Sequence, residues 1–189
     1  MKYYIMFGPP GAGKGTQAKL LVERFNFRHI STGEVLRKEI SAGSELGLKA
    51  KALIEKGAFV PDEIVEGIIG REIAGNRDAK GFLFDGFPRT TAQAEALDDI
   101  LKEYGEEVTG VISIMIDDAT VKERIRHRAE IENRKDDMDD ATIENRIRTY
   151  HEKTEPLIEY YRKRGKYIEI KGEGGIETIF GRICGIVEK

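Results

Sequence analysis

A glycine-rich segment near the start of the chain has the residue types that bind phosphate. Residues 8–16 read Gly-Pro-Pro-Gly-Ala-Gly-Lys-Gly-Thr, between an apolar run at Tyr3–Phe7 and a helical pattern. Glycines let backbone N–H groups approach a phosphate, and the first turn of a helix adds partial positive charge. Lys14 would reach the β- and γ-phosphates, and a hydroxyl would lie beside Mg²⁺; here Gly15 follows the lysine, so Thr16 stands one place late. The segment predicts a polyphosphate nucleotide ligand, and a ligand-free strand-to-helix turn is the alternative.

A phosphate-binding loop does not by itself identify a reaction. GTPases, ATP-driven motors and small-molecule kinases all use one. The Asn-Lys-x-Asp motif with which GTPases read their base is absent from the sequence, which disfavours that class. Residues for a second substrate are needed to choose among the others.

The elements that must position this loop alternate along the chain. Short apolar runs predict strands at Tyr3–Phe7, His29–Ile30, Phe82–Phe84, Val111–Ile116 and Tyr167–Ile170. Helical periodicity predicts helices near Gly15–Phe25, Glu34–Ala42, Leu46–Lys56, Ile64–Ala74, Thr91–Tyr104, Thr120–Ala129, Thr142–Arg164 and Ile176–Val187. Strands separated by helices imply parallel crossovers. We therefore expect an α/β fold, a doubly wound parallel five-stranded sheet with helices on both faces.

Three helix starts carry the capping-box pattern, in which a side chain at each end of the box satisfies a backbone N–H group of the other. The pairs are Ser31 with Glu34, Thr90 with Gln93, and Thr120 with Glu123. The pattern predicts helices that begin directly after Ser31, Thr90 and Thr120.

Length and composition exclude several classes of protein. With 189 residues, 40% hydrophobic content and a net charge of −3, the chain fits one globular domain and does not favour a nucleic-acid partner. The single cysteine, Cys184, excludes a disulfide framework or multi-cysteine zinc site and fits a reducing compartment. The apolar runs are too short to span a membrane, and the N-terminus lacks a signal-peptide pattern. We expect a cytoplasmic protein with no membrane partner.

Three further segments carry a specific resemblance. Residues 31–37 read STGEVLR, residues 56–61 read KGAFVP, and residues 85–93 read DGFPRTTAQ. With the Gly15-Thr16 form of the loop, they resemble the signatures of the adenylate kinase family over essentially the whole chain. The resemblance implies reversible, Mg²⁺-dependent transfer of the ATP γ-phosphoryl group to AMP, giving two ADP, and a role in nucleotide homeostasis. It also implies a monomeric kinase domain, 1–189, with an AMP-binding helical insertion at 31–60 and a short lid at 128–138.

The resemblance assigns site residues position by position. For ATP it implies Gly11, Ala12, Gly13, Lys14, Gly15, Thr16, Arg124, Arg128 and Gly174. For AMP it implies Thr32, Arg37, Lys56, Gly57, Ala58, Phe59, Val60, Gly86, Arg89, Gln93, Arg134 and Arg146. The catalytic set that it implies is Lys14, Arg89, Arg128, Arg134 and Arg146.

Positive charge suits these positions, because phosphoryl transfer brings two highly charged groups together. Arg37 and Arg89 match the arginines that hold the acceptor phosphate, where a guanidinium group can make paired contacts. A solvated helix residue is the alternative for Arg37, and a loop arginine paired with Asp85 is the alternative for Arg89. Asp85 follows an apolar run, at the end of a strand, and matches the aspartate that orders the hydration shell of Mg²⁺. Its alternative is a turn aspartate.

Two further positions bear on the acceptor base. Thr32 and Gln93 match the residues that recognise adenine, whereas the related uridylate and cytidylate kinases tend to carry alanine and asparagine there. The pair therefore favours AMP. Gln93 has a competing structural role, because it would complete the capping box of Thr90.

The later arginines follow helical spacing. Arg124 and Arg128 share one helix face, and Arg126 points elsewhere. By resemblance Arg124 stacks over the ATP base and Arg128 contacts its phosphates, while Arg134 and Arg146 close over the transferring group. Without the other motifs, a solvated charged helix face would be the preferred interpretation.

The lid is short, because only five residues separate Arg128 from Arg134. With no cysteines in it, we expect no structural zinc. Asp136 and Asp137 are expected lid contacts, although the acidic stretch 136–140 could instead be a solvated loop or the start of a helix. The three histidines show no metal or triad spacing. A UMP/CMP kinase and a catalytically silent nucleotide-binding module remain the alternative functions.

Overall fold

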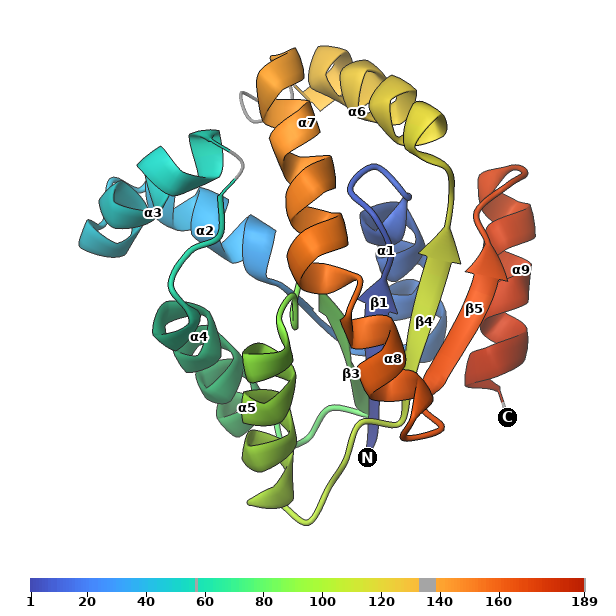
Figure 1. Cartoon of the computed structure of the whole chain (residues 1–189). Helices are drawn as coiled ribbons and strands as arrows, with labels where there is room; N and C mark the ends of the chain where they lie inside the picture. The colour runs from blue at the N-terminus through green and yellow to red at the C-terminus, as the bar shows by residue number, and fades with distance from the viewer. Residues whose placement is uncertain (57, 133–138, 189) are drawn as a thin grey trace.

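Five parallel strands form a single sheet in the computed structural model, which describes residues 1–56, 58–132 and 139–188. The sheet order is β2-β3-β1-β4-β5 (Figure 1). The strands are β1 (Lys2–Phe7), β2 (Arg28–Ser31), β3 (Gly81–Asp85), β4 (Gly110–Met115) and β5 (Tyr167–Lys171). Each predicted strand is confirmed to within two residues at either end.

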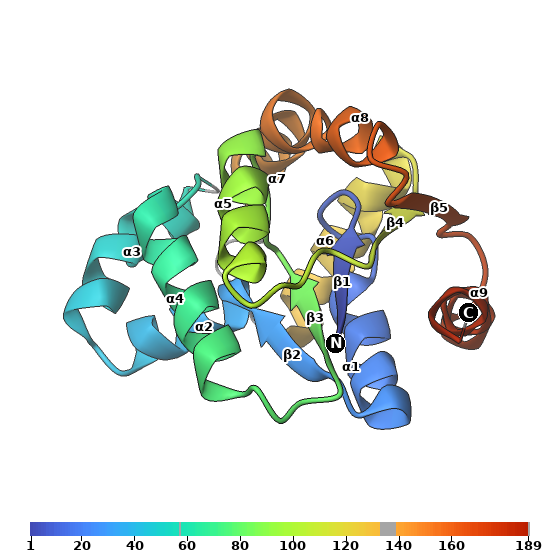
Figure 2. The same cartoon turned by 90° about the horizontal axis from the view of Figure 1, so that it is seen from below.

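Helices cover both faces of the sheet, as the fully apolar strands predict for a parallel sheet. The described helices are α1 (Lys14–Phe25), α2 (Thr32–Ser41), α3 (Glu45–Glu55), α4 (Asp62–Gly75), α5 (Thr91–Lys102), α6 (Asp118–Glu132), α7 (Asp140–Thr149), η2 (Tyr150–Thr154), α8 (Leu157–Arg162) and α9 (Ile176–Val187). On one face, Ile69 of α4, Leu97 of α5 and Leu157 of α8 are in the buried cluster; on the other are Leu21 of α1 and Ile183 of α9 (Figure 2). The predicted α/β fold class is confirmed.

The sheet brings three loops together at its carboxyl edge. Met6 of β1 pairs with Asp85 of β3, and Phe7 pairs with Ser113 of β4, so the chain leaves all three strands at the same edge. In open α/β sheets this edge binds ligands. The phosphate-binding loop follows the central strand, β1.

Two helical units flank this edge (Figure 1). Helices α2 and α3 extend to one side, and α6 and α7 lie above the loop that follows β1. The contact between α6 and α7 has its own apolar cluster of Val121, Ile125, Ile143 and Ile147. The cluster fixes how α6 lies on α7.

The predicted helix Thr142–Arg164 is wrong as one continuous element. Helix α7 ends at Thr149, a π-helical turn covers Tyr150–Thr154, and α8 begins at Leu157. The backbone N–H of Glu155 donates to the carbonyl of Tyr150 at 2.8 Å, five residues back. Pro156 then has no N–H group to continue the helical pattern, so the helix is interrupted there.

The predicted start of α6 is also wrong. The helix begins at Asp118, two residues before Thr120. Asp117 accepts hydrogen bonds from the Thr120 backbone N–H at 2.9 Å and from its hydroxyl at 2.7 Å. An aspartate side chain is at least as good a cap as threonine. Asp117 therefore caps the helix, and Thr120 lies within its first turn.

The other two predicted caps are confirmed. Ser31 accepts from the N–H of Glu34, and Thr90 accepts from the N–H of Gln93. Across the ranges described here, the helices are each too short or too polar to cross a membrane.

Candidate active site

Two glycines of the loop after β1 have positive φ angles and close contacts that a side chain would disturb. Gly8 has φ of +129°, and a Cβ on it would lie 2.4 Å from the carbonyl oxygen of Ile114. Gly11 has φ of +77°, and its Cβ would lie 3.0 Å from Ile125 and 3.1 Å from the carbonyl oxygen of Val121. The loop can therefore pass close to β4 and directly beneath α6.

Lys14 is the first residue of α1, and Gly13 is its N-cap. The Nζ atom of Lys14 donates to the carbonyl oxygens of Gly8 and Pro9, at 2.9 and 2.8 Å. Although the residue keeps some exposed surface, burial of its ammonium group lowers its pKa to about 8. Burial contributes most to this value; Arg89, Arg128 and Arg146 also lower the pKa, and Asp85 raises it.

The structure therefore brings four predicted cations and one predicted carboxylate together. Arg89 follows β3, Arg128 lies on α6 and Arg146 lies on α7, yet all three act electrostatically on Lys14 of α1. Such a concentration of positive charge suits a highly charged anion.

Asp85 ends β3 beside the start of α1. A Cβ on Gly15 would lie 3.6 Å from its Oδ2 atom, which places this carboxylate next to the phosphate-binding loop and Thr16. Within the described ranges, His, Cys, Asp and Glu side chains do not gather in groups of three that could hold a metal ion. One carboxylate beside a phosphate-binding loop nevertheless fits Mg²⁺, which usually keeps several waters and takes ligands from substrate phosphates.

The loop after β3 holds Arg89 and Thr32 against one carbonyl group. The Nε atom of Arg89 and the hydroxyl of Thr32 both donate to the carbonyl oxygen of Gly86, at 2.8 and 3.0 Å. Gly86 has φ of +80°, and a Cβ on it would lie 2.9 Å from the Arg89 guanidinium group. The guanidinium group of Arg89 also lies 5.5 Å from the ring centre of Phe59. The expected adenine-binding threonine and the expected phosphate-binding arginine are thus neighbours.

Gln93 is buried at the start of α5 and is only 2% exposed. Its Oε1 atom accepts from the backbone N–H of Arg89 at 2.8 Å, and its Nε2 atom donates to Oδ1 of Asp62 at 2.6 Å. The capping box is therefore only half correct: Thr90 caps the helix, but the Gln93 side chain returns to Arg89, because that N–H group lies within its reach. Asp62, the first residue of α4, was not predicted as part of the site.

The expected acceptor wall lies between α3 and α4. Arg37 of α2 lies over the start of its own helix, since a Cβ on Gly33 would be 3.2 Å from its Nη1 atom. Ala58 and Phe59 are half-buried and Val60 is buried. The carbonyl oxygen of Lys56 accepts from Nδ2 of Asn145 at 2.8 Å, which links this wall to α7.

The expected ATP-base side is formed by α6 and the loop after β5. The Nη2 atom of Arg124 donates to the carbonyl oxygen of Gly172 at 3.1 Å. Gly174, two residues further on, is exposed and has φ of +102°. Arg126 points to the other side, as expected, and pairs with Asp140 at 2.9 Å.

Part of the expected site falls outside the described residues, namely Gly57, Arg134, Asp136 and Asp137. At the end of the acidic stretch, Asp139 caps α7 by accepting from the N–H groups of Ala141 and Thr142. Of the alternatives for this stretch, the start of a helix is therefore confirmed for Asp139 and Asp140.

Comparison with known proteins decides the family. The sequence model of adenylate kinase matches residues 6–166. A Synechococcus adenylate kinase is 46% identical over 99% of this chain and all of its own length. Adenylate kinases of Phocaeicola vulgatus and Archaeoglobus fulgidus are 44% and 40% identical, each over 98% of this chain and 97% of their own length.

The chain belongs to the adenylate kinase family. It is an ATP:AMP phosphotransferase, and among the described positions that the resemblance assigns, Asp85, Arg89, Arg128 and Arg146 surround Lys14 at the carboxyl edge of the sheet. Two polar residues that contact expected site residues were missed from the sequence: Asp62 and Asn145. The Val-Pro-Asp sequence at 60–62, which signals the start of a helix, was a usable sign for Asp62. For Asn145 no local signal exists, because its partner lies 89 residues away.

Proposed function

We propose that this kinase transfers the γ-phosphoryl group of ATP directly to AMP at the carboxyl edge of the sheet. The observation that carries the proposal is the enclosed ammonium group of Lys14, with Asp85, Arg89, Arg128 and Arg146 around it. In-line transfer between two phosphates needs alignment and charge neutralisation, without a covalent intermediate.

On the donor side, the glycine loop offers its N–H groups to the ATP phosphates, and Lys14 offers its ammonium group to the β- and γ-phosphates. Arg128 adds positive charge from above, on α6. Arg124 and Gly174 lie where the base of ATP would be, because Arg124 is tied to the loop after β5.

On the acceptor side, Arg37 and Arg89 hold the AMP phosphate. Thr32, Gly86 and Gln93 surround the adenine, and Lys56–Val60 form the wall beside it. Arg146 neutralises the charge that spreads over the transferring group. Arg134 has the same role in the proposal, by resemblance.

Bound with ATP, Mg²⁺ would neutralise phosphate oxygens, with Asp85 holding it through water and the Thr16 hydroxyl beside it. Residues 31–60 form the AMP-binding segment, and residues 128–138 form the short lid. Their closure excludes water, because an open site would transfer the phosphoryl group to water. By resemblance to the family the protein is a monomer, and the single, buried Cys184 supports a cytoplasmic location.

A coupled assay for ADP formation tests the proposal with ATP and each nucleoside monophosphate in turn. We expect AMP to be the preferred acceptor. Higher turnover with UMP or CMP would select a pyrimidine nucleotide kinase instead, and nucleotide binding in calorimetry without turnover would select a silent module.

Arg89→Ala tests the acceptor-phosphate role. We expect turnover to fall about a hundredfold or more, because a donor aimed at developing charge contributes about that much. Arg71→Ala, on the exposed side of α4, is the matched control and should stay near the wild-type rate. Circular dichroism must show both variants folded. An Arg89→Ala rate within a few-fold of wild type would remove Arg89 from the mechanism.

A further inference from the structure

The buried amide group of Gln93 is held from both ends. Its oxygen accepts from the backbone N–H of Arg89 at 2.8 Å, and its nitrogen donates to the carboxylate of Asp62 at 2.6 Å. Asp62 comes from α4 and Arg89 from the loop after β3, so two separate elements meet at this side chain. A buried amide that is bonded at both atoms has a fixed orientation.

The chemistry of the two partners allows only one orientation. A backbone N–H group can only donate, and an ionised carboxylate can only accept. Turning the amide over would place its NH₂ group against the Arg89 N–H and its oxygen against the Asp62 carboxylate. One hydrogen bond would be replaced by a donor facing a donor, and the other by an acceptor facing an acceptor. Both contacts are unfavourable in a buried site.

The Gln93 amide retains one unused hydrogen-bond acceptor and one unused hydrogen-bond donor. The amide oxygen has two lone pairs and the amide nitrogen two hydrogens, and each has used one. The remaining acceptor and donor match a 6-aminopurine, whose N6 amino group donates and whose N1 accepts. A 6-oxopurine presents the reverse pattern, since its O6 accepts and its N1 carries hydrogen. Gln93 could serve a 6-oxopurine only by turning over.

We propose that Asp62 is a specificity-determining positioning residue, which orients the Gln93 amide so that the acceptor site takes 6-aminopurine and rejects 6-oxopurine monophosphates. The proposal rests on the proposed contact of Gln93 with the acceptor base. Asp62 itself need not touch the nucleotide. It acts by making the reversed amide unfavourable, and a site built to hydrogen-bond one pattern rejects the other strongly.

The test compares kcat/KM for AMP and IMP in the wild type and in two variants. IMP is the closest probe, because it replaces the 6-amino group by an oxygen and adds no 2-amino group. In Asp62→Ala we expect the AMP/IMP ratio to fall about tenfold or more, the scale of one charge-assisted hydrogen bond. In Asp62→Asn the fall should be smaller, because the asparagine oxygen can still accept from Gln93.

Glu63→Ala is the matched control. Glu63 is the adjacent, exposed carboxylate in the first turn of α4, so its loss removes the same charge from the start of the helix. The ratio should be unchanged in this variant. A purely structural role of Asp62 would lower the rates with both nucleotides together and leave the ratio where it was.

An unchanged AMP/IMP ratio in a folded Asp62→Ala protein would overturn the proposal while leaving the kinase activity intact. If Asp62→Ala did not fold, equal losses of kcat/KM for AMP and IMP in Asp62→Asn would overturn it, because they leave the AMP/IMP ratio unchanged. Failure of the wild type to form ADP from AMP would overturn the proposed function, and the role of Asp62 with it.

Discussion

Lys14, for which we propose a catalytic role, has an unfavourable environment for its charge. Burial, with additional contributions from the three arginines, lowers its pKa to about 8 from an ordinary value of 10.5. Asp85 opposes them. A bound polyphosphate would bring negative charge beside the ammonium group and favour its protonated form. Ligand binding and protonation of this residue should therefore be coupled.

We expect ATP binding at pH 8 to be accompanied by proton uptake. Near this pH about half of the free protein carries a neutral Lys14, because the pH equals its pKa. The phosphates raise that pKa, so up to about half a proton is taken up per ATP. Calorimetry in two buffers with different ionisation enthalpies measures the uptake. Lys14→Met should abolish it, and Lys19→Met, an exposed lysine of the same helix, should retain it. Equal binding enthalpies in both buffers for the wild type would contradict the prediction.

Polar contacts at two places add to the apolar cluster that holds α6 on α7. At the far end, Arg126 pairs with Asp140. At the near end, His151 of η2 lies between two carboxylates: its Nδ1 atom is 2.8 Å from Glu155, and its Nε2 atom is 3.1 Å from Asp118 of α6. The hydrogen bond with Glu155 raises the pKa of His151, and the bond and charge of Asp118 add to this against a smaller opposing effect of burial. The imidazole, when protonated, therefore joins the start of α6 to η2 by two charged contacts.

This contact should stabilise the fold more at low pH than at high pH. The folded pKa of His151 is raised above its unfolded value, so its contribution is complete below about pH 6.5 and is lost as the pH rises through the folded pKa. We expect His151→Gln to lower the free energy of unfolding more at pH 6 than at pH 9, in urea titrations.

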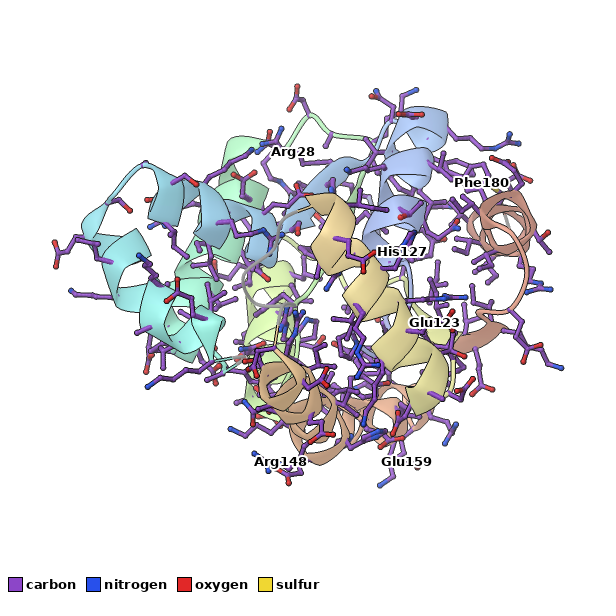
Figure 3. All side chains as sticks on the ribbon, turned by 90° about the horizontal axis from the view of Figure 1, so that it is seen from above. Arg28, Glu123, His127, Arg148, Glu159 and Phe180 are labelled. Atoms are coloured by element: carbon purple, nitrogen blue, oxygen red, sulfur yellow. The ribbon has the colours of Figure 1, made fainter. Side chains whose placement is uncertain are left out.

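His127→Gln is the control for this prediction. His127 lies on the outer side of α6 (Figure 3), and its ring nitrogen is 4.0 Å from Glu130. Its substitution should have little effect at either pH. An equal loss of stability at pH 6 and pH 9 in His151→Gln would show that the charge of this imidazole does not hold α6.

At the scale of the whole molecule, the sheet supports two helical units: α2 and α3 extend to one side of its carboxyl edge, and α6 and α7 lie above the phosphate-binding loop (Figure 1). Asn145 of α7 donates to the carbonyl of Lys56, and Lys153 of η2 lies 5.6 Å from the ring centre of Phe59. These contacts connect the segment after α3 with α7, the helix that carries Arg146, and with η2. Closure around two nucleotides would move α3 and α6 toward each other.

Energy transfer between dyes on α3 and α6 tests this closure. Leu48 is 64% exposed on α3, so Leu48→Cys with His127→Cys gives two labelling sites once Cys184 is replaced by serine. We expect energy transfer between the dyes to increase when an analogue that joins both substrates binds, because the closed site must exclude water during phosphoryl transfer. Dyes at Lys19→Cys and Lys102→Cys, on α1 and α5, should report no change. Unchanged transfer between α3 and α6 at saturating analogue would rule out this closure.

The sequence by itself determined the strands, most of the helices, the phosphate-binding loop and the family. These features depend on local signals: apolar runs of strand length, glycines beside a lysine, and arginines at helical spacing. The errors were local as well. Thr120 matched the capping pattern, but Asp117, three residues earlier, caps the helix. The helical periodicity of 142–164 continued across Pro156, which interrupts the helix.

Only the tertiary structure decided how the side chains of the site are held. Asp62 meets Gln93 across 31 residues, His151 meets Asp118 across 33, and Asn145 meets Lys56 across 89. Each pair joins two elements that come together only when the sheet and its helices are in place. Hydrogen bonds act over about 3 Å, so a sequence can name a residue that reads a base, whereas the partner that orients it depends on the packing of the folded chain.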